Sequence, residues 1–310
     1  MIWKKKGLWF NALEQNSWFK SHAQIPTPLI KDDVVRVFFA GRPRPDMSMT
    51  SYVDFDRNDL SKIVYVHDRP ILDLGKRGMF DEHGVMPAHA VDRGNGLILL
   101  YYSGWQRAVD ILYNNYTGLA VSEDGGDTFK RYFEGPILDR TTHELYSATS
   151  PYVMEHEGKW HAWYCSGTNW HEIDGKLEHT YDMKHAISDD GYVWHQPNEV
   201  AIKQKNEFEA HCMPAIIKRG DTFYMWYSYR GSKGFRKGSG DAYRLGLAKS
   251  KDLKDWERID DKAGIELSDS GFDSEMIAYP CIFEMDGKTI MFYNGNSFGK
   301  DGFGMAILEE

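Results

Sequence analysis

The chain of 310 residues has few cysteines and no long apolar run. Its three cysteines, Cys165, Cys212 and Cys281, are odd in number and far apart, which excludes a disulfide framework and is typical of a reducing compartment. No segment approaches the run of about 18 apolar residues that a membrane-spanning helix needs. Basic residues near the start are followed by no apolar stretch, so no signal peptide is apparent. These absences predict a cytoplasmic protein that does not contact a membrane.

An excess of positive charge is also missing. The 37 Lys and Arg residues are outnumbered by 46 Asp and Glu, and the formal net charge is -9. Nucleic-acid binding requires a basic surface that neutralises phosphates. We therefore expect no nucleic-acid partner.

The sequence does contain one pattern five times: a small polar stretch, a proline, an apolar run and then a pair of aromatic residues. The prolines that anchor the copies are spaced 61, 64, 63 and 66 residues apart. They are Pro26, Pro87, Pro151, Pro214 and Pro280. A near-constant period of this size predicts a repeat architecture.

Each copy reads as short strands separated by Gly, Asp and Asn turns, with no competing helical period. Three copies continue into a fourth strand, whereas the last copy stops after its third, and residues 2–10 resemble the missing one. The pattern predicts an all-β fold, a single five-bladed β-propeller of four-stranded antiparallel blades closed by the N-terminal strand. A β-sandwich is the alternative, but it does not explain the period. The expected blades cover 16–75, 76–139, 140–203, 204–265, and 266–310 together with 1–12.

A propeller would bring the starts of the first strands and the loops after the second strands to one mouth of its central channel. The polar residues expected there are His22, Gln24, Arg42, Asp81, Glu82, His83, Trp105, Glu144, Ser150, Trp170, Glu209, His211, Arg230, Asp273, Glu275 and Tyr279. Carboxylates bind hydroxyls, indoles stack on sugar rings, and a pair of carboxylates can cleave an acetal. These groups predict a site for a carbohydrate or another sugar-containing small molecule.

Three acids are the candidates for catalysis: Asp81, Glu209 and Glu275. Glu209 and Glu275 both stand five residues before their proline, and period-two alternation places them on the channel side. The competing interpretation is structural, because buried carboxylates commonly pair with Arg or Tyr. A metal held by His22, His83, His211 and Glu209 is a further possibility, but no ligand spacing supports it, and we expect no metal or cofactor.

The third strands of the repeat, such as His185–Trp194 with the sequence HAISDDGYVW, resemble those of five-bladed propeller glycoside hydrolases. That group includes arabinanases and xylosidases, invertases and levansucrases, and mannoside phosphorylases. The resemblance covers the whole chain and implies the propeller fold and carboxylate chemistry on a glycoside.

One departure from the family pattern concerns the catalytic acids. Arabinanase-type members carry two acids directly before the prolines of blades one and two, and a third acid on blade three. Here the first two positions hold Ile25 (or Thr27) and Met86, and the blade-three positions hold Thr149 and Ser150. The family's three acids therefore do not transfer.

The stretch SEDGGDTF at 122–129 also resembles the Asp box of sialidases. Arg42, Arg230 and Arg244 are candidates for a sialidase arginine trio, but five repeats do not match the six-bladed sialidase fold.

Three functions follow as hypotheses. The first is a glycoside hydrolase-like enzyme that uses the carboxylates on a small glycan. The second is a cytoplasmic enzyme of glycan biosynthesis that acts on an activated or phosphorylated sugar, for which arginines suit phosphate recognition. The third is a sugar-binding propeller without catalysis.

Overall fold

The computed structural model describes residues 1–15, 17–238 and 240–309 and is built almost entirely of strands. The strands are β1 (Ile2–Asn11), β2 (Ser21–Ile30), β3 (Val34–Arg44), β4 (Met47–Asp56), β5 (Ile63–Val66), β6 (Gly84–Asp92), β7 (Ile98–Arg107), β8 (Tyr113–Ser122), β9 (Lys130–Arg131), β10 (Ala148–His156), β11 (Lys159–Ile173), β12 (Lys176–Ser188), β13 (His195–Ile202), β14 (Ala210–Arg219), β15 (Thr222–Arg230), β16 (Arg244–Ser250), β17 (Glu257–Arg258), β18 (Ala278–Met285), β19 (Lys288–Asn294) and β20 (Gly302–Glu309). Helical turns are η1 (Ala12–Glu14), η2 (Phe235–Lys237), η3 (Asp260–Lys262) and α1 (Asn296–Gly299). Within the described ranges, no helix is long and apolar enough to cross a membrane.

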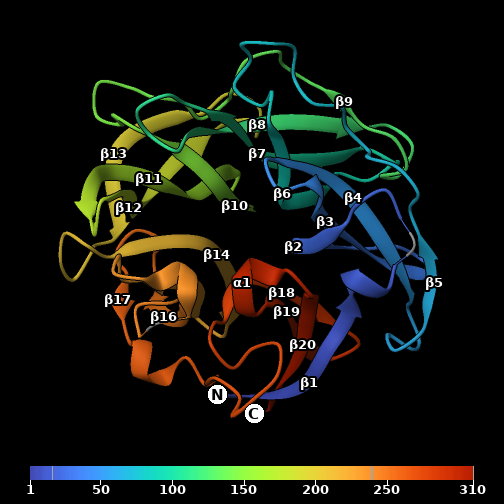
Figure 1. Cartoon of the computed structure of the whole chain (residues 1–310). Coiled ribbons are helices and arrows are strands. Elements are labelled where there is room, and N and C mark those ends of the chain that lie inside the picture. Colours follow the sequence, from blue (N-terminus) through green and yellow to red (C-terminus); the bar gives the residue numbers. More distant parts are fainter. Residues whose placement is uncertain (16, 239, 310) are drawn as a thin grey trace.

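Antiparallel pairing groups the strands into units of four. Four units follow the chain order, β2 to β5, β6 to β9, β10 to β13 and β14 to β17, and the remaining unit combines β18, β19 and β20 with β1. Figure 1 shows the units arranged around a common centre, with the two chain ends close together. The all-β prediction is therefore confirmed.

The paired aromatic residues explain how neighbouring units hold together. Consecutive residues of a strand point to opposite faces of its sheet, so each pair presents one ring to each side. All ten rings are completely buried. On β7, for example, Tyr101 packs in the cluster shared with β10 and β11, whereas Tyr102 packs in the cluster shared with β3 and β4. Each unit is thus buried on both faces, with large apolar area removed from water on each side.

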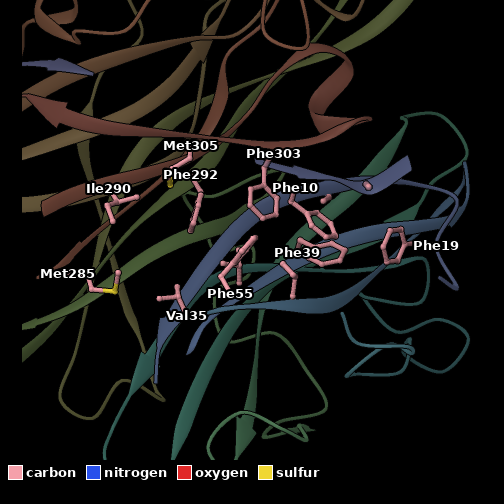
Figure 2. Close-up of a cluster of buried hydrophobic side chains, with 14 residues drawn as sticks. Phe10, Phe19, Val35, Phe39, Phe55, Met285, Ile290, Phe292, Phe303 and Met305 are labelled. Atoms are coloured by element: carbon pink, nitrogen blue, oxygen red, sulfur yellow. The ribbon is translucent and has the colours of Figure 1, made fainter. Parts of the chain in front are cut away.

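One of these clusters joins the start of the chain to its end. Phe10 of β1 and Phe39 of β3 pack with Phe292 of β19 and Phe303 of β20 (Figure 2). The rings of Phe10 and Phe303 are stacked, with centroids 5.3 Å apart. β1 pairs antiparallel with β20, from Ile2 opposite Glu309 to Asn11 opposite Gly302.

The anchoring prolines mark irregularities in the first strands. The register of β2, β6, β10, β14 and β18 against the next strand shifts at or beside the proline, as at a β-bulge. The residue before the proline has a positive φ in four units: Ile25 (57°), Ser150 (54°), Met213 (50°) and Tyr279 (57°). Such backbone costs about 1–3 kcal/mol per residue, and it re-aims the side chain at each bulge.

Candidate ligand pocket

The re-aimed side chains line a cavity of about 250 Å³ at the centre of the fold. All five residues that precede the prolines contribute to it: Ile25, Met86, Ser150, Met213 and Tyr279. Ile25 and Met86 occupy the positions at which the resembling hydrolases carry acids. Both of these side chains are apolar.

The rest of the lining is aromatic, hydroxylic and cationic. It consists of Gln24, Arg42, Pro45, Ser103, Trp105, Tyr113, Asn115, Ser147, Thr149, Cys165, His179, Tyr181, Cys212, Phe235, Arg236, Tyr243 and Phe298. Within residues 1–15, 17–238 and 240–309, no Asp or Glu lines this cavity. Among the residues expected at the mouth, Gln24, Arg42, Trp105, Ser150 and Tyr279 line it.

Two guanidinium groups line the pocket, those of Arg42 and Arg236. Arg236 of η2 donates to Glu178, with Nη2 2.9 Å from Oε2. Arg42 of β3 donates to the amide oxygen of Gln24 from Nε (3.1 Å) and Nη2 (2.9 Å), and it forms no ion pair with a described residue. Burial, together with the charge of Arg236, lowers the pKa of Arg42 despite the opposing effect of Tyr279. Arg42 is thus a cation whose charge no carboxylate of the described residues balances.

His22 experiences the same positive field. Burial, followed by the charges of Arg42 and Lys300, lowers the pKa of His22 to about 3. Its Nδ1 lies 2.7 Å from the hydroxyl of Ser21. His22 is therefore neutral at pH 7 and contributes no charge beside Arg42.

His179 of β12 is a buried polar side chain without a partner. It is 2% exposed, and neither ring nitrogen forms a hydrogen bond with a described residue. The indole of Trp170 stacks on it, with centroids 4.3 Å apart. The hydroxyl of Ser147, which also lines the pocket, is likewise unpartnered. Burial and the charge of Arg230 lower the pKa of His179 to about 3, so a neutral imidazole is available to a ligand.

Arg230, at the end of β15, is 1% exposed and lies behind the lining. Its guanidinium donates to the hydroxyls of Tyr181 (3.1 Å) and Tyr243 (3.3 Å), and its carbon lies 3.7 Å from the ring centroid of Phe235. It forms no ion pair with a carboxylate of the described residues. It therefore adds a second uncompensated positive charge beside the pocket.

Three of the expected site acids form the same network in three units. Asp81, Glu144 and Asp273 each accept a hydrogen bond from the buried tyrosine of the second strand, at 3.0, 2.6 and 2.9 Å respectively. The donors are Tyr102, Tyr164 and Tyr293. A base completes each network: Arg131 (2.7 Å), Lys184 (3.3 Å) and Lys5 (2.8 Å). These acids are at most 2% exposed and are bound within their units.

Glu209 and His211 form a related network in the unit of β14 to β17. Arg258 donates to both carboxylate oxygens of Glu209, at 2.9 and 3.0 Å, and His211 Nε2 lies 3.0 Å from Oε2. Burial opposes ionisation, but hydrogen bonds from His211 and Arg258 outweigh it and lower the pKa of Glu209. Neither residue lines the pocket.

The remaining expected residues, Glu82, His83, Trp170 and Glu275, do not line the pocket. Glu82 accepts hydrogen bonds from the backbone of Gly78 (2.7 Å) and from Gln106 (2.9 Å). The ring of His83 stacks on that of Trp105, with centroids 6.0 Å apart. Glu275 is exposed, and its backbone N–H donates to Asn296. The indole of Trp170 stacks on the ring of His179.

The histidines named as possible metal ligands, with Glu209, do not come together in one group. Among the described residues, no group of three or more His, Cys, Asp or Glu side chains is arranged to hold a metal ion. His211 is engaged by Glu209 within its own unit, whereas His22 and His83 have other neighbours.

Sequence reasoning missed the pocket residues at the starts of the third strands. The third strand begins where the second ends, so its first residues share the same mouth. Tyr113, His179, Tyr181 and Tyr243 lie at or near these starts, in the stretches YNNYTG, HTYDMK and AYRLGL. The sequence feature that could have identified them is the aromatic residue or histidine near the start of each of these third strands.

The fold is shared with glycoside hydrolases. A solved structure described as a glycoside hydrolase aligns with a TM-score of 0.75 at 16% identity, covering 99% of this chain and 93% of its own length. A structure from work on the GH130 family of mannoside phosphorylases aligns at 0.71 and 13%, with coverages of 99% and 93%. Sucrose-6-phosphate hydrolase from Lactobacillus gasseri aligns at 0.65 and 16%, covering 97% of this chain and 66% of its own. At these identities the likeness shows the fold alone.

Sequence comparison identifies nearer relatives. "Uncharacterized protein MT1551" and "Uncharacterized protein Rv1502", from two strains of Mycobacterium tuberculosis (CDC 1551 / Oshkosh and ATCC 25618 / H37Rv), are each 34% identical over 311 residues. The match covers 100% of this chain and 100% of each relative. The chain belongs to the same family as these mycobacterial proteins. No family model matches it.

Proposed function

We propose that the protein is a carbohydrate-active five-bladed β-propeller whose central pocket binds an activated or phosphorylated sugar. The observation that carries this proposal is the chemistry of the lining: two guanidiniums, several hydroxyls and aromatic rings, and no carboxylate among the described residues. Arg binds phosphate through parallel N–H donors, and aromatic and hydroxyl groups suit a sugar ring. The alternative of glycosidic cleavage by two carboxylates requires acids that face the substrate, and none of the described residues that line the pocket is an acid.

The five-bladed arrangement is supported by the way the apolar clusters alternate with the units. Each second-strand pair contributes one ring to each of two clusters, and the cluster of Phe39 and Phe292 links the first unit to the last. In the closing unit, Lys5 of β1 binds Asp273 as Arg131 of β9 binds Asp81. β1 therefore takes the place of a fourth strand, and the chain forms one domain.

A melting-temperature screen tests the ligand. The panel contains sugar 1-phosphates, nucleotide diphosphate sugars and the corresponding neutral sugars and oligosaccharides. We expect the phosphorylated members to raise the melting temperature and to bind in calorimetry, because an anion compensates Arg42. Binding of neutral oligosaccharides with equal affinity would contradict the proposal.

Arg42→Gln is the matching variant. It keeps a polar side chain near Gln24 but removes the charge, and we expect about a 10- to 100-fold loss of affinity for the phosphorylated ligand, the range for one charge-assisted contact. Arg219→Gln is the control, because Arg219 lies at the β14–β15 turn, bound to Glu284 and Thr289 and outside the pocket lining. Equal affinities for both variants would place the ligand elsewhere.

A further inference from the structure

Two of the three cysteines meet in the pocket although they are far apart in sequence. Cys165 lies on β11 and Cys212 on β14, in neighbouring units, and both line the cavity. Both are free thiols, and both belong to the same cluster of buried side chains. The third cysteine, Cys281, is buried outside the lining.

The surroundings of the two thiols differ in a way that suits thiol–disulfide exchange. Cys212 and Tyr243 pack in one buried cluster, and Arg230, whose charge no described carboxylate balances, donates to the hydroxyl of Tyr243 at 3.3 Å. Burial alone would raise the pKa of Cys212, but the contacts with Cys165 and Tyr243 and the charge of Arg230 lower it. Burial, reinforced by the contact with Cys212, raises the pKa of Cys165 well above its usual value. The lowered pKa of Cys212 favours the thiolate, which is the attacking form in exchange, and the raised pKa of Cys165 favours the thiol.

We propose that Cys165 and Cys212 form a redox-active pair, which small-molecule disulfides oxidise to a disulfide bond inside the pocket. The Cys212 thiolate attacks one sulfur of a disulfide such as oxidised glutathione, and one glutathione leaves as a thiol. Cys165 then loses its proton to solvent, and its sulfur attacks the Cys212 sulfur and releases the second glutathione. Two protein thiols are oxidised, and one small-molecule disulfide is reduced to two thiols.

The unpartnered imidazole of His179 supports the view that small molecules enter this part of the fold. It lies on the same lining as both cysteines, with two ring nitrogens available.

Intact-mass spectrometry of the full chain tests the pair without any sugar. After treatment with oxidised glutathione, we expect loss of two hydrogen atoms, no retained glutathione, and one cross-link between the peptides that contain Cys165 and Cys212. Dithiothreitol should restore the original mass. Stable glutathionylation of Cys212 in the wild-type chain, a cross-link that includes Cys281, or no reaction would each overturn the proposal.

Single variants resolve the order of attack. Cys165→Ser should retain one glutathione on Cys212, Cys212→Ser should form neither adduct nor cross-link, and Cys281→Ser should behave as the wild type. Adduct formation on Cys165 in Cys212→Ser at the wild-type rate would contradict the assigned roles. Melting curves confirm that each variant is folded. Because no sugar is involved, failure here is distinguishable from failure of the proposed ligand.

Discussion

At the scale of single residues, the sequence predicted acidic side chains at a ligand site, whereas the structure binds most of these acids within their own four-stranded units. Asp81, Glu144 and Asp273 each bind a buried tyrosine and a base in the same way. Burial, followed by the neighbouring carboxylate, raises the pKa of those three tyrosines, so their hydroxyls remain hydrogen-bond donors. We infer that this repeated network stabilises each unit.

Replacing Arg131 tests that inference. Arg131→Met leaves the carboxylate of Asp81 buried without its cation, and we expect a loss of about 3 kcal/mol in the free energy of unfolding, as for other broken buried pairs. Urea denaturation at pH 7 measures the loss. Affinity for the phosphorylated sugar should not change, because Arg131 does not line the pocket.

The control is the neighbouring Lys130, whose side chain is 67% exposed and pairs with Glu123. Lys130→Met should change the stability by no more than about 0.5 kcal/mol. If both variants were equally stable, Asp81 would be free of a structural requirement and its catalytic assignment would regain support.

At the scale of elements, the first and second strands of the repeat could be predicted and the direction of their side chains could not. Apolar runs with paired aromatics indicate strands buried on both faces, which the structure has. Period-two alternation, however, holds only where a strand is regular. Before the bulge the alternation is kept, but the face that meets the pocket is that of Cys212, whereas Glu209 and His211 lie on the other face beside Arg258. The bulge and the positive φ at Met213 then bring the next side chain into the pocket lining as well. A hydrophobic pattern does not show which face of a strand meets a pocket.

The N-terminal strand provides a prediction at the same scale. Trp3 of β1 is 4% exposed, and its ring lies 5.4 Å from that of Trp226, edge to face. Trp3→Ala should lower the free energy of unfolding by about 3–5 kcal/mol, because a large buried ring is lost from the cluster beside β20. Ile2→Ala is the matched control: Ile2 is 64% exposed on the opposite face, and its truncation should cost under about 0.5 kcal/mol.

Equal effects of the two substitutions would mean that β1 does not contribute to stability through its buried face. Chemical denaturation of both variants under one set of conditions gives the comparison. The sequence indicated this strand by its resemblance to the fourth strands of other copies. It could not indicate that Lys5 would bind Asp273, because that ion pair depends on the pairing of β1 with β20.

At the scale of the whole molecule, the overall charge and the local charge differ in sign. The chain has a formal net charge of -9, yet Arg42, Arg230 and Arg236 gather at or behind one cavity. The acids are distributed among networks within the units and over the surface. The net charge from the composition led us to expect no nucleic-acid partner. It could not reveal the arginines that gather at one cavity, because it averages over the whole chain.

Buried histidines make the stability of the whole fold depend on pH. Burial lowers the pKa of His179 to about 3, while in the unfolded chain its pKa is near the ordinary 6.5. On acidification the unfolded state binds the proton first, so the free energy of unfolding falls as pH decreases from 6.5 towards 3. From pH 7.5 to 5.5 the loss should be about 1.4 kcal/mol for this residue.

Urea denaturation at pH 7.5 and 5.5 checks this dependence in the wild type and in His179→Gln. The variant has no group to protonate at this position, so its loss between the two pH values should be smaller by about 1.4 kcal/mol. His195→Gln is the control, since His195 is exposed at the start of β13 and should leave the dependence unchanged. His22, His89 and His161, whose pKa values burial also lowers, act in the same direction and keep some dependence in every variant. Identical losses in His179→Gln and the wild type would mean that His179 takes up its proton in the folded pocket, where an imidazolium beside Arg230 would then need a bound anion.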